Sequence, residues 1–168
     1  MQSTIEDVPK TNMRRAPWAR RIGTVLLALF IGSGAAGLLG DSVQTESADE
    51  AGYTLTLKYP KVTRSGLDVP WELDITSTEP LPEQIVIAVT GDYFDIFDHQ
   101  GLDPEAYSQT ADDEMEYWTF DTPGGTTMLI SIDQYVDPGA MTGSSGTVGL
   151  FIDGELTAPI TFTTRMLP

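Results

Sequence analysis

Leu67-Asp-Val-Pro-Trp-Glu-Leu-Asp-Ile75 decides the fold class, because apolar and polar residues alternate strictly along it. Successive side chains of a β-strand point to opposite faces, so a period of two predicts a strand with one buried face. Trp71 stands in the middle of the apolar face. It is therefore expected to be the centre of a hydrophobic core.

The same alternation recurs on both sides of this stretch. Turn-forming sequences rich in proline, glycine and aspartate separate the alternating segments, and Asp153-Gly154 is the strongest hairpin signal among them. No long amphipathic helix interrupts the series. The sequence thus predicts an immunoglobulin-like antiparallel β-sandwich of about seven strands. The expected strands are residues 53–59, 67–75, 84–90, 115–120, 127–133, 148–152 and 155–166.

Residues 22–40 carry no charge and are mostly apolar. A helix of this length would reach about 28 Å, close to the roughly 30 Å hydrocarbon core of a bilayer. Basic residues precede the segment and acidic residues follow it, which favours a cytoplasmic N-terminus and an exported C-terminal part. The predicted organisation is a cytoplasmic tail (1–21), a transmembrane helix (22–40), an acidic linker (41–52) and an exported β-sandwich (53–168).

A cleaved export signal is the alternative for the same residues. The seven apolar residues 25–31 precede Ser33-Gly-Ala35, a run of small residues typical of a cleavage site. Both interpretations place the C-terminal part outside the cytoplasm. They differ in whether the protein stays attached to the membrane.

Small residues recur every fourth position within this segment and form one stripe of the expected helix. Such a stripe allows close helix packing, either with a second copy or with a multi-pass membrane protein. The simpler explanation is that glycine and alanine are common in membrane segments. The candidate packing residues are Ala28, Gly32, Ala36 and Gly40.

Charge is distributed unevenly along the chain. Residues 1–21 have five basic and two acidic residues, whereas residues 41–168 have four basic and 23 acidic residues, a net charge of −19. A field of this sign repels phosphate backbones, so nucleic-acid binding is not expected. The chain has no cysteine, so an ordinary apolar core must stabilise an exported domain without disulfides.

Gly91 to Ala111 breaks the alternation and contains an aromatic and acidic cluster. In the simplest interpretation, Asp92 caps a short helical turn whose Tyr93 and Phe97 close one end of the sandwich. Alternatively, Tyr93, Phe94 and Phe97 are exposed and bind a partner. A third interpretation is a calcium site, weakly indicated because the aspartates do not follow EF-hand spacing. Its candidate ligands are Asp92, Asp95, Asp98 and Asp103.

Catalytic motifs are lacking. The chain has a single histidine, His99, no cysteine, and no serine in a nucleophile-elbow sequence. Carboxylates are so abundant that a pair of them indicates nothing specific. We therefore expect no catalytic residues, no enzymatic activity and no cofactor.

Six segments spread over nearly the whole exported part form a recognisable set. They are Tyr59-Pro60, Arg64-Ser-Gly-Leu-Asp-Val-Pro-Trp71, Asp92-Tyr-Phe-Asp-Ile-Phe-Asp98, Gly101-Leu-Asp-Pro104, Trp118-Thr-Phe120 and Thr164-Arg-Met-Leu-Pro168. Through these segments the exported part resembles a group of small actinobacterial membrane-anchored proteins with one Ig-like domain. The resemblance implies a single N-terminal membrane helix and an exported sandwich, and it implies no activity or site residues.

These observations predict a membrane-anchored extracytoplasmic module that binds an unidentified protein partner without catalysis. One alternative is an accessory subunit that docks on a multi-pass membrane protein through its helix. Another is a calcium-binding surface domain.

Overall fold

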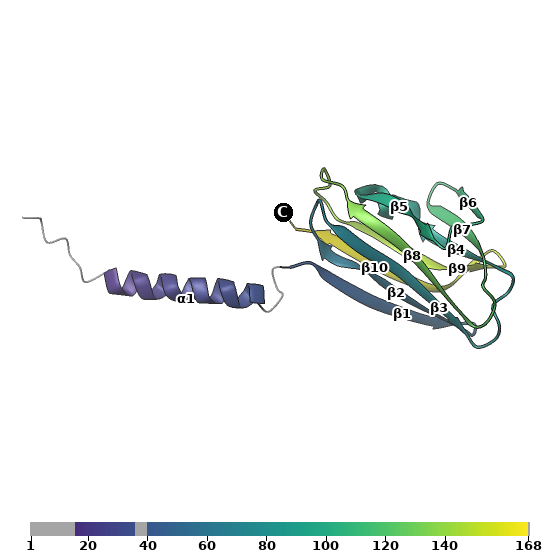
Figure 1. Ribbon diagram of the computed structural model, residues 1–168, viewed down its shortest axis with the longest axis horizontal. Coiled ribbons are helices and arrows are strands. Elements are labelled where there is room, and N and C mark those ends of the chain that lie inside the picture. Colours follow the sequence, from purple (N-terminus) through teal and green to yellow (C-terminus); the bar gives the residue numbers. More distant parts are fainter. Residues whose placement is uncertain (1–15, 36–39, 168) are drawn as a thin grey trace, which may run out of the picture. The chain divides into compact units, whose positions relative to one another are not determined.

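The computed structural model describes residues 16–35 and 40–167, and it divides the chain into two compact units, Met1–Gly40 and Asp41–Pro168. Figure 1 shows a single helix in the first unit and a β-sheet in the second. The second unit is called the β domain below. Most of the predicted cytoplasmic tail, residues 1–15, lies outside the described residues.

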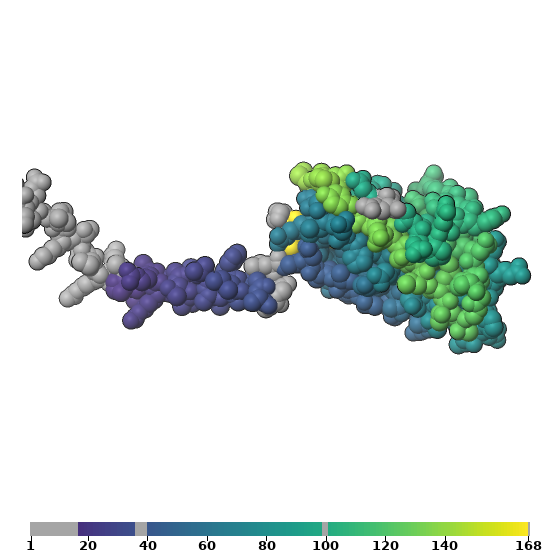
Figure 2. Space-filling model, in the orientation of Figure 1, coloured from purple at the N-terminus to yellow at the C-terminus, as the bar shows by residue number. Residues whose placement is uncertain are grey.

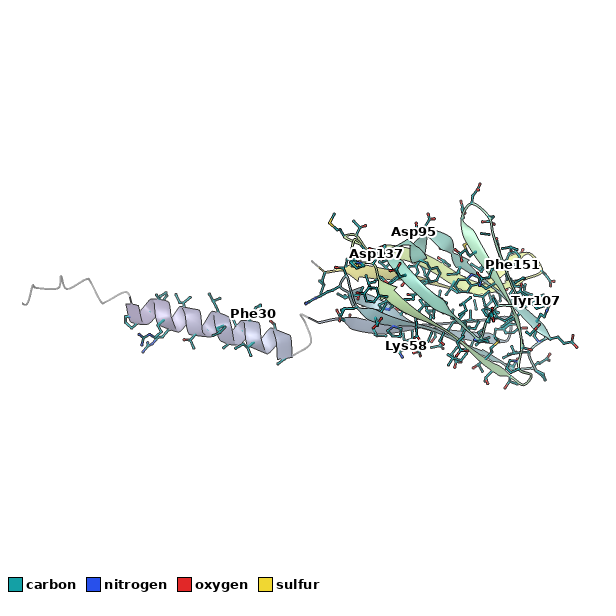
Figure 3. The ribbon with its side chains drawn as sticks, turned by 45° about the horizontal axis from the view of Figure 1, so that its top comes forward. Phe30, Lys58, Asp95, Tyr107, Asp137 and Phe151 are labelled. Carbon is teal, nitrogen blue, oxygen red and sulfur yellow. The ribbon has the colours of Figure 1, made fainter. Side chains whose placement is uncertain are left out.

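Helix α1 (Ala16–Ala35) is the only element described in the first unit. Its apolar side chains are exposed; Phe30, labelled in Figure 3, has 65% of its surface exposed. Ala28 and Gly32 lie on this helix, and a Cβ atom at Gly32 would meet no other atom within 4 Å. Ala36 lies outside the described residues, and Gly40 lies in a bend after the helix. Helix packing through these residues stays a prediction.

The predicted transmembrane helix is not found. Within residues 16–35 and 40–167, no helix is both long enough and apolar enough to cross a membrane. The physical reason lies in the composition of α1, which includes Arg20 and Arg21 and ends in the small residues Gly32-Ser-Gly-Ala35. The single-pass membrane anchor is therefore a wrong prediction for the described residues, whereas export is not tested by this finding and stays a prediction.

The described part of the β domain, residues 41–167, contains ten strands and one short 3₁₀ helix, η1. The elements are β1 (Ser42–Glu50), β2 (Tyr53–Thr63), β3 (Asp68–Ser77), β4 (Gln84–Thr90), η1 (Gly91–Ile96), β5 (Phe97–Asp103), β6 (Ser108–Ala111), β7 (Met115–Asp121), β8 (Thr127–Val136), β9 (Ser144–Ile152) and β10 (Glu155–Met166). The all-β character of this part of the chain agrees with the alternation in the sequence.

All ten strands form one continuous sheet that curls like half a barrel, so the predicted two-sheet Ig-like sandwich is wrong. The strand order is β5-β8-β3-β2-β10-β9-β4-β7-β6, with β1 also paired to β2. A short parallel pairing of β10 with β2, in which Arg165 lies opposite Val62 and Met166 opposite Thr63, joins the two halves of this order, β5 to β2 and β10 to β6. Leu167 continues this contact by donating its N–H to the Thr63 carbonyl at 2.8 Å. Figure 2 shows residues of β1 to β3 (blue) and of β8 (green) on the face of the domain that is turned to the viewer.

The predicted acidic linker, residues 41–52, is instead strand β1 and its turn. β1 pairs antiparallel with β2 along its whole length, from Ser42 to Glu50. A carboxylate oxygen of Glu50 also accepts the backbone N–H of Ala158 at 2.7 Å, at the bulge of β10 where Ala158 has φ +50°. The strand was missed because backbone hydrogen bonds hold it at the sheet edge, where polar and charged side chains are common.

The expected Asp153-Gly154 hairpin is confirmed. These residues have φ values of +51° and +84°, and they connect β9 to β10 with Ile152 opposite Glu155. Positive φ at both central residues is the requirement of a type I′ turn.

Trp71 lies at the centre of the core, as expected, with no exposed surface. Its ring makes edge contacts with Phe94, Trp118 and Phe162, with centroid distances of 6.0, 6.1 and 6.5 Å. These partners come from η1, β7 and β10. The aromatic cluster therefore joins the two halves of the curled sheet from inside.

Candidate functional site

The aromatic residues expected to contact a partner are buried instead. Tyr93, Phe94 and Phe97 have exposed fractions of 0%, 3% and 5%. η1 turns Tyr93 and Phe94 inward, and the rings of Tyr93 and Phe97 lie 5.4 Å apart. The partner-binding prediction for these three residues is wrong, because their apolar rings complete the core. Asp92 does not cap η1 either, since its N-cap is Thr90.

The calcium candidates are not brought together. Asp92 and Asp95 lie on η1, whereas Asp98 and Asp103 lie on β5, opposite Tyr135 and Ser131 of β8. Among the residues that the structure describes, no group of three or more His, Cys, Asp or Glu side chains could hold a metal ion. The four carboxylates are therefore spread over η1 and β5 and surround no common centre.

Strands β4 and β9 separate at one end of the sheet. Their ladder contains only three pairs, from Val89 opposite Val148 to Ile87 opposite Leu150. The same register would next bring Val86 opposite Phe151, but no pair is formed there. Each strand instead keeps its partner on the outer side: Val86 pairs with Thr119 of β7, and Phe151 pairs with Leu156 of β10. The separation leaves a slot in the sheet.

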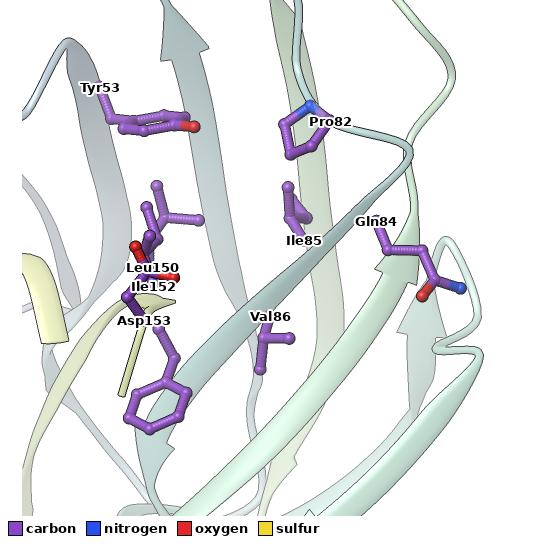
Figure 4. A pocket seen from close by; sticks show the side chains of 9 residues that line it. Tyr53, Pro82, Gln84, Ile85, Val86, Leu150, Ile152 and Asp153 are labelled. Carbon is purple, nitrogen blue, oxygen red and sulfur yellow. The ribbon is translucent and has the colours of Figure 1, made fainter. Parts of the chain in front are cut away.

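A pocket of about 240 Å³ occupies this slot (Figure 4). Ile85 and Leu150, which are 5% and 1% exposed, are its most deeply buried lining residues. Figure 4 shows Tyr53 and Pro82 on opposite sides of its upper part, with Val86 lower down. This pocket is called the β4–β9 pocket. Its described lining residues are Tyr53, Pro82, Gln84, Ile85, Val86, Leu150, Phe151, Ile152 and Asp153.

Phe151, which lines one wall of the pocket, is packed against other side chains. The Phe151 ring packs against Tyr117 of β7 at a centroid distance of 4.9 Å, and the Tyr117 hydroxyl donates to Asp112 at 2.8 Å. The Asp112 carboxylate also accepts the N–H groups of Glu114 and Met115, and these hydrogen bonds, led by that of Glu114, lower its pKa. The hydrogen bond to Asp112 correspondingly raises the pKa of Tyr117. These contacts hold the Phe151 ring in place.

The rim of the pocket is acidic. Gln84 donates to Asp121 at 2.8 Å, and Asp153 stands at the hairpin beside the pocket. Hydrogen bonds from Thr78 to Gly52 and from Leu81 to Gly125 bring the β1–β2, β3–β4 and β7–β8 connections together at this end of the sheet, and Asp153 of the β9–β10 hairpin lines the same pocket. These connections and the strand residues next to them include seven carboxylates and no lysine or arginine. The acidic residues are Asp49, Glu50, Glu79, Glu83, Asp121, Asp153 and Glu155.

The four basic residues of the β domain lie elsewhere. Lys58 forms an ion pair with Glu72 at 2.8 Å, midway along β2 and β3. Lys61 and Arg64 follow toward the far end of β2, and Arg165 lies opposite Val62. Figure 3 shows Asp95 toward one end of the domain and Phe151 toward the other. The pocket end thus has an uncompensated negative charge.

The arrangement suits binding better than catalysis. The nine described residues that line the pocket include one carboxylate, one phenol and one amide, but no histidine, cysteine, serine or lysine. These groups form no nucleophile and base pair. The pocket offers apolar surface and a negative rim, which favour an apolar group accompanied by positive charge.

The sequence did not identify this pocket. It arises because β4 and β9, more than 50 residues apart, pair over three positions and then diverge. Alternation predicts each strand but says nothing about where a ladder ends. The Asp153-Gly154 turn was the one residue signal that marked this region.

Comparisons with known proteins do not identify a family. No protein-family model matches the chain, and a search of curated proteins finds no match. One similar solved structure is the Pseudomonas fluorescens alkylpurine DNA glycosylase AlkC bound to DNA containing an abasic site analog, with 15% identity, 76% of this chain covered and a TM-score of 0.32. The match covers 32% of that chain, and a TM-score of this size indicates neither a shared fold nor a shared function. The resemblance to actinobacterial membrane-anchored proteins stays a prediction.

Proposed function

We propose that this protein is a non-enzymatic interaction module that binds a protein partner through the β4–β9 pocket. The observation that supports the proposal is the slot where the β4–β9 ladder ends, because it combines apolar walls with a partly open mouth. Small-molecule sites are mostly apolar concavities with a few polar groups, and an anchoring side chain of a protein partner fills a pocket of the same kind. The residues expected from the sequence to bind a partner are buried, so this proposal relies on different residues.

A site-specific photocrosslink tests this function. With p-benzoylphenylalanine at Gln84, on the exposed rim of the pocket, we expect one discrete crosslinked product in the cells that make the protein. The matched control carries the same probe at Asp74, an exposed position on β3. The crosslink should be absent at Asp74, because that face lies away from the pocket.

A second variant tests whether the crosslink at Gln84 depends on the pocket itself. Val86→Trp places a larger side chain into the slot and should abolish the Gln84 crosslink, provided that the variant retains its cooperative thermal unfolding. Products of equal intensity at Gln84 and Asp74, or no product at Gln84, would contradict the proposed function.

A further inference from the structure

We infer that the occupant of the β4–β9 pocket is an extended peptide segment that carries basic residues around one apolar side chain. This inference rests on the proposed function and adds the chemistry of the partner. Three features of the pocket end support it: the open ladder, the apolar lining and the one-sided charge.

The open ladder favours an extended backbone. Val86 and Phe151 both lie in strands, and each is paired on only one side in the described ladders. The edges that face the slot therefore present main-chain groups to an incoming chain. Addition of a strand to such an edge is a common mode of peptide recognition, in which main-chain hydrogen bonds supply affinity.

The lining favours an apolar anchor. Ile85 and Leu150 line the interior of the slot, and the half-buried Val86, Phe151 and Ile152 line its sides. A volume of about 240 Å³ is several times the share of one water in the liquid, which is about 30 Å³. The pocket therefore has room for one aliphatic or aromatic side chain, and in a strand the neighbouring side chains then point away from it.

The charge favours basic flanks. The seven carboxylates at this end are not balanced by a nearby lysine or arginine, while the domain's four basic residues are elsewhere. Complementary charge accelerates association and excludes partners of the wrong sign. An anionic segment would be repelled from the same rim.

Fluorescence anisotropy with the full chain tests this inference. The probe is a labelled peptide, Lys-Arg-Val-Leu-Val-Arg-Lys, and versions with valine or phenylalanine at the centre are tested in parallel. One matched peptide replaces each basic residue with glutamate, and another replaces the three central residues with serine. We expect binding of the basic apolar peptides, weakened by added salt, and at least about tenfold weaker binding of both matched peptides, which corresponds to about 1.4 kcal/mol.

Two charge-matched variants locate the site. Glu83→Gln, Asp153→Asn and Glu155→Gln together remove three carboxylates from the pocket end, and asparagine tolerates the positive φ of position 153. Asp68→Asn, Asp95→Asn and Asp98→Asn remove three exposed carboxylates from the other end. The first triple variant should weaken binding about tenfold, and the second less than about twofold.

Several results would overturn the inference. They are equal losses in the two triple variants, equal binding of the glutamate peptide, or no binding of any basic peptide at millimolar concentration. If these occur while the Gln84 crosslink persists, the partner chemistry is wrong and the proposed function stands. If the basic peptides bind as expected but no crosslink forms in cells, the proposed function fails.

Discussion

Replacing Trp71 with alanine is expected to lower the free energy of unfolding of the β domain by about 3–5 kcal/mol. The side chain is fully buried and contacts rings from η1, β7 and β10, so its removal leaves a cavity lined from several elements. Collapse of the neighbours cannot fill this cavity, because each belongs to a strand or turn held by its own backbone bonds. A typical domain has a total stability of about 5–15 kcal/mol, so the loss is a large fraction of it.

Urea unfolding, monitored by far-UV circular dichroism, measures this effect. The control is Leu129→Ala, since Leu129 lies on the outer face of β8 with 53% of its surface exposed, and a change within about 0.5 kcal/mol is expected. Equal losses in the two variants would contradict the central role of Trp71. Trp71→Phe should cost less than alanine, because it retains an aromatic ring and removes a buried indole N–H that has no hydrogen-bond partner.

Thr164→Val is expected to destabilise the β domain by about 2–4 kcal/mol, although valine has nearly the shape of threonine. The Thr164 hydroxyl donates to the Pro60 carbonyl at 2.6 Å and lies 2.8 Å from the Tyr93 hydroxyl, in a fully buried position. Valine leaves both oxygens without this partner, and a buried polar group left unsatisfied costs about 1–3 kcal/mol. The hydrogen-bonded chain connects η1, β10 and β2.

The same unfolding measurement on Thr163→Val provides the control. Thr163 is the neighbouring residue on β10, and its hydroxyl contacts Ser145 on the exposed face. Its replacement should change stability by less than about 0.5 kcal/mol. A double-mutant cycle with Tyr93→Phe should give a clear coupling energy, since Tyr93 and Thr164 are in direct contact. Additive effects of the two substitutions would argue against the chain of hydrogen bonds.

Tyr93 should also make the domain sensitive to alkaline pH. Burial raises the pKa of Tyr93 above its ordinary value near 10, while the hydrogen bond to Thr164 acts in the opposite direction and is weaker. Below about pH 10 the phenol is neutral in both states, so stability does not depend on it. Above about pH 10 it ionises only in the unfolded chain, so the free energy of unfolding falls as pH rises toward the higher folded-state pKa. Urea midpoints between about pH 9 and 11 should fall less steeply for Tyr93→Phe, and equal slopes would exclude this contribution.

The N-terminal and acidic segments show where composition misleads. An uncharged run at residues 22–40 suggested a membrane span, but the described helix begins at Ala16, includes two arginines and ends in small residues. Residues 42–50 read as a linker because they are polar, yet they pair along β2. Composition reports the preference of side chains for water or lipid. It does not report backbone pairing, because every residue has a backbone carbonyl acceptor and every residue except proline has an N–H donor.

Alternation of apolar and polar residues by itself determined the strands on either side of residues 91–111 and the inward face of β3 with Trp71 at its centre, and the Asp-Gly dipeptide at 153–154 determined the hairpin, whereas β1, β5 and β6 were not predicted. These features depend on residues close in sequence, because the side-chain period of a strand and the φ values of a turn are local properties. Only the tertiary structure decided that the strands form one curled sheet, that Tyr93, Phe94 and Phe97 are core residues, and that β4 and β9 separate around a pocket. Those features depend on which distant strands pair and where their ladders end. The last residues of β10, paired with the end of β2, join the two halves of the sheet, and no local pattern in either strand encodes that contact.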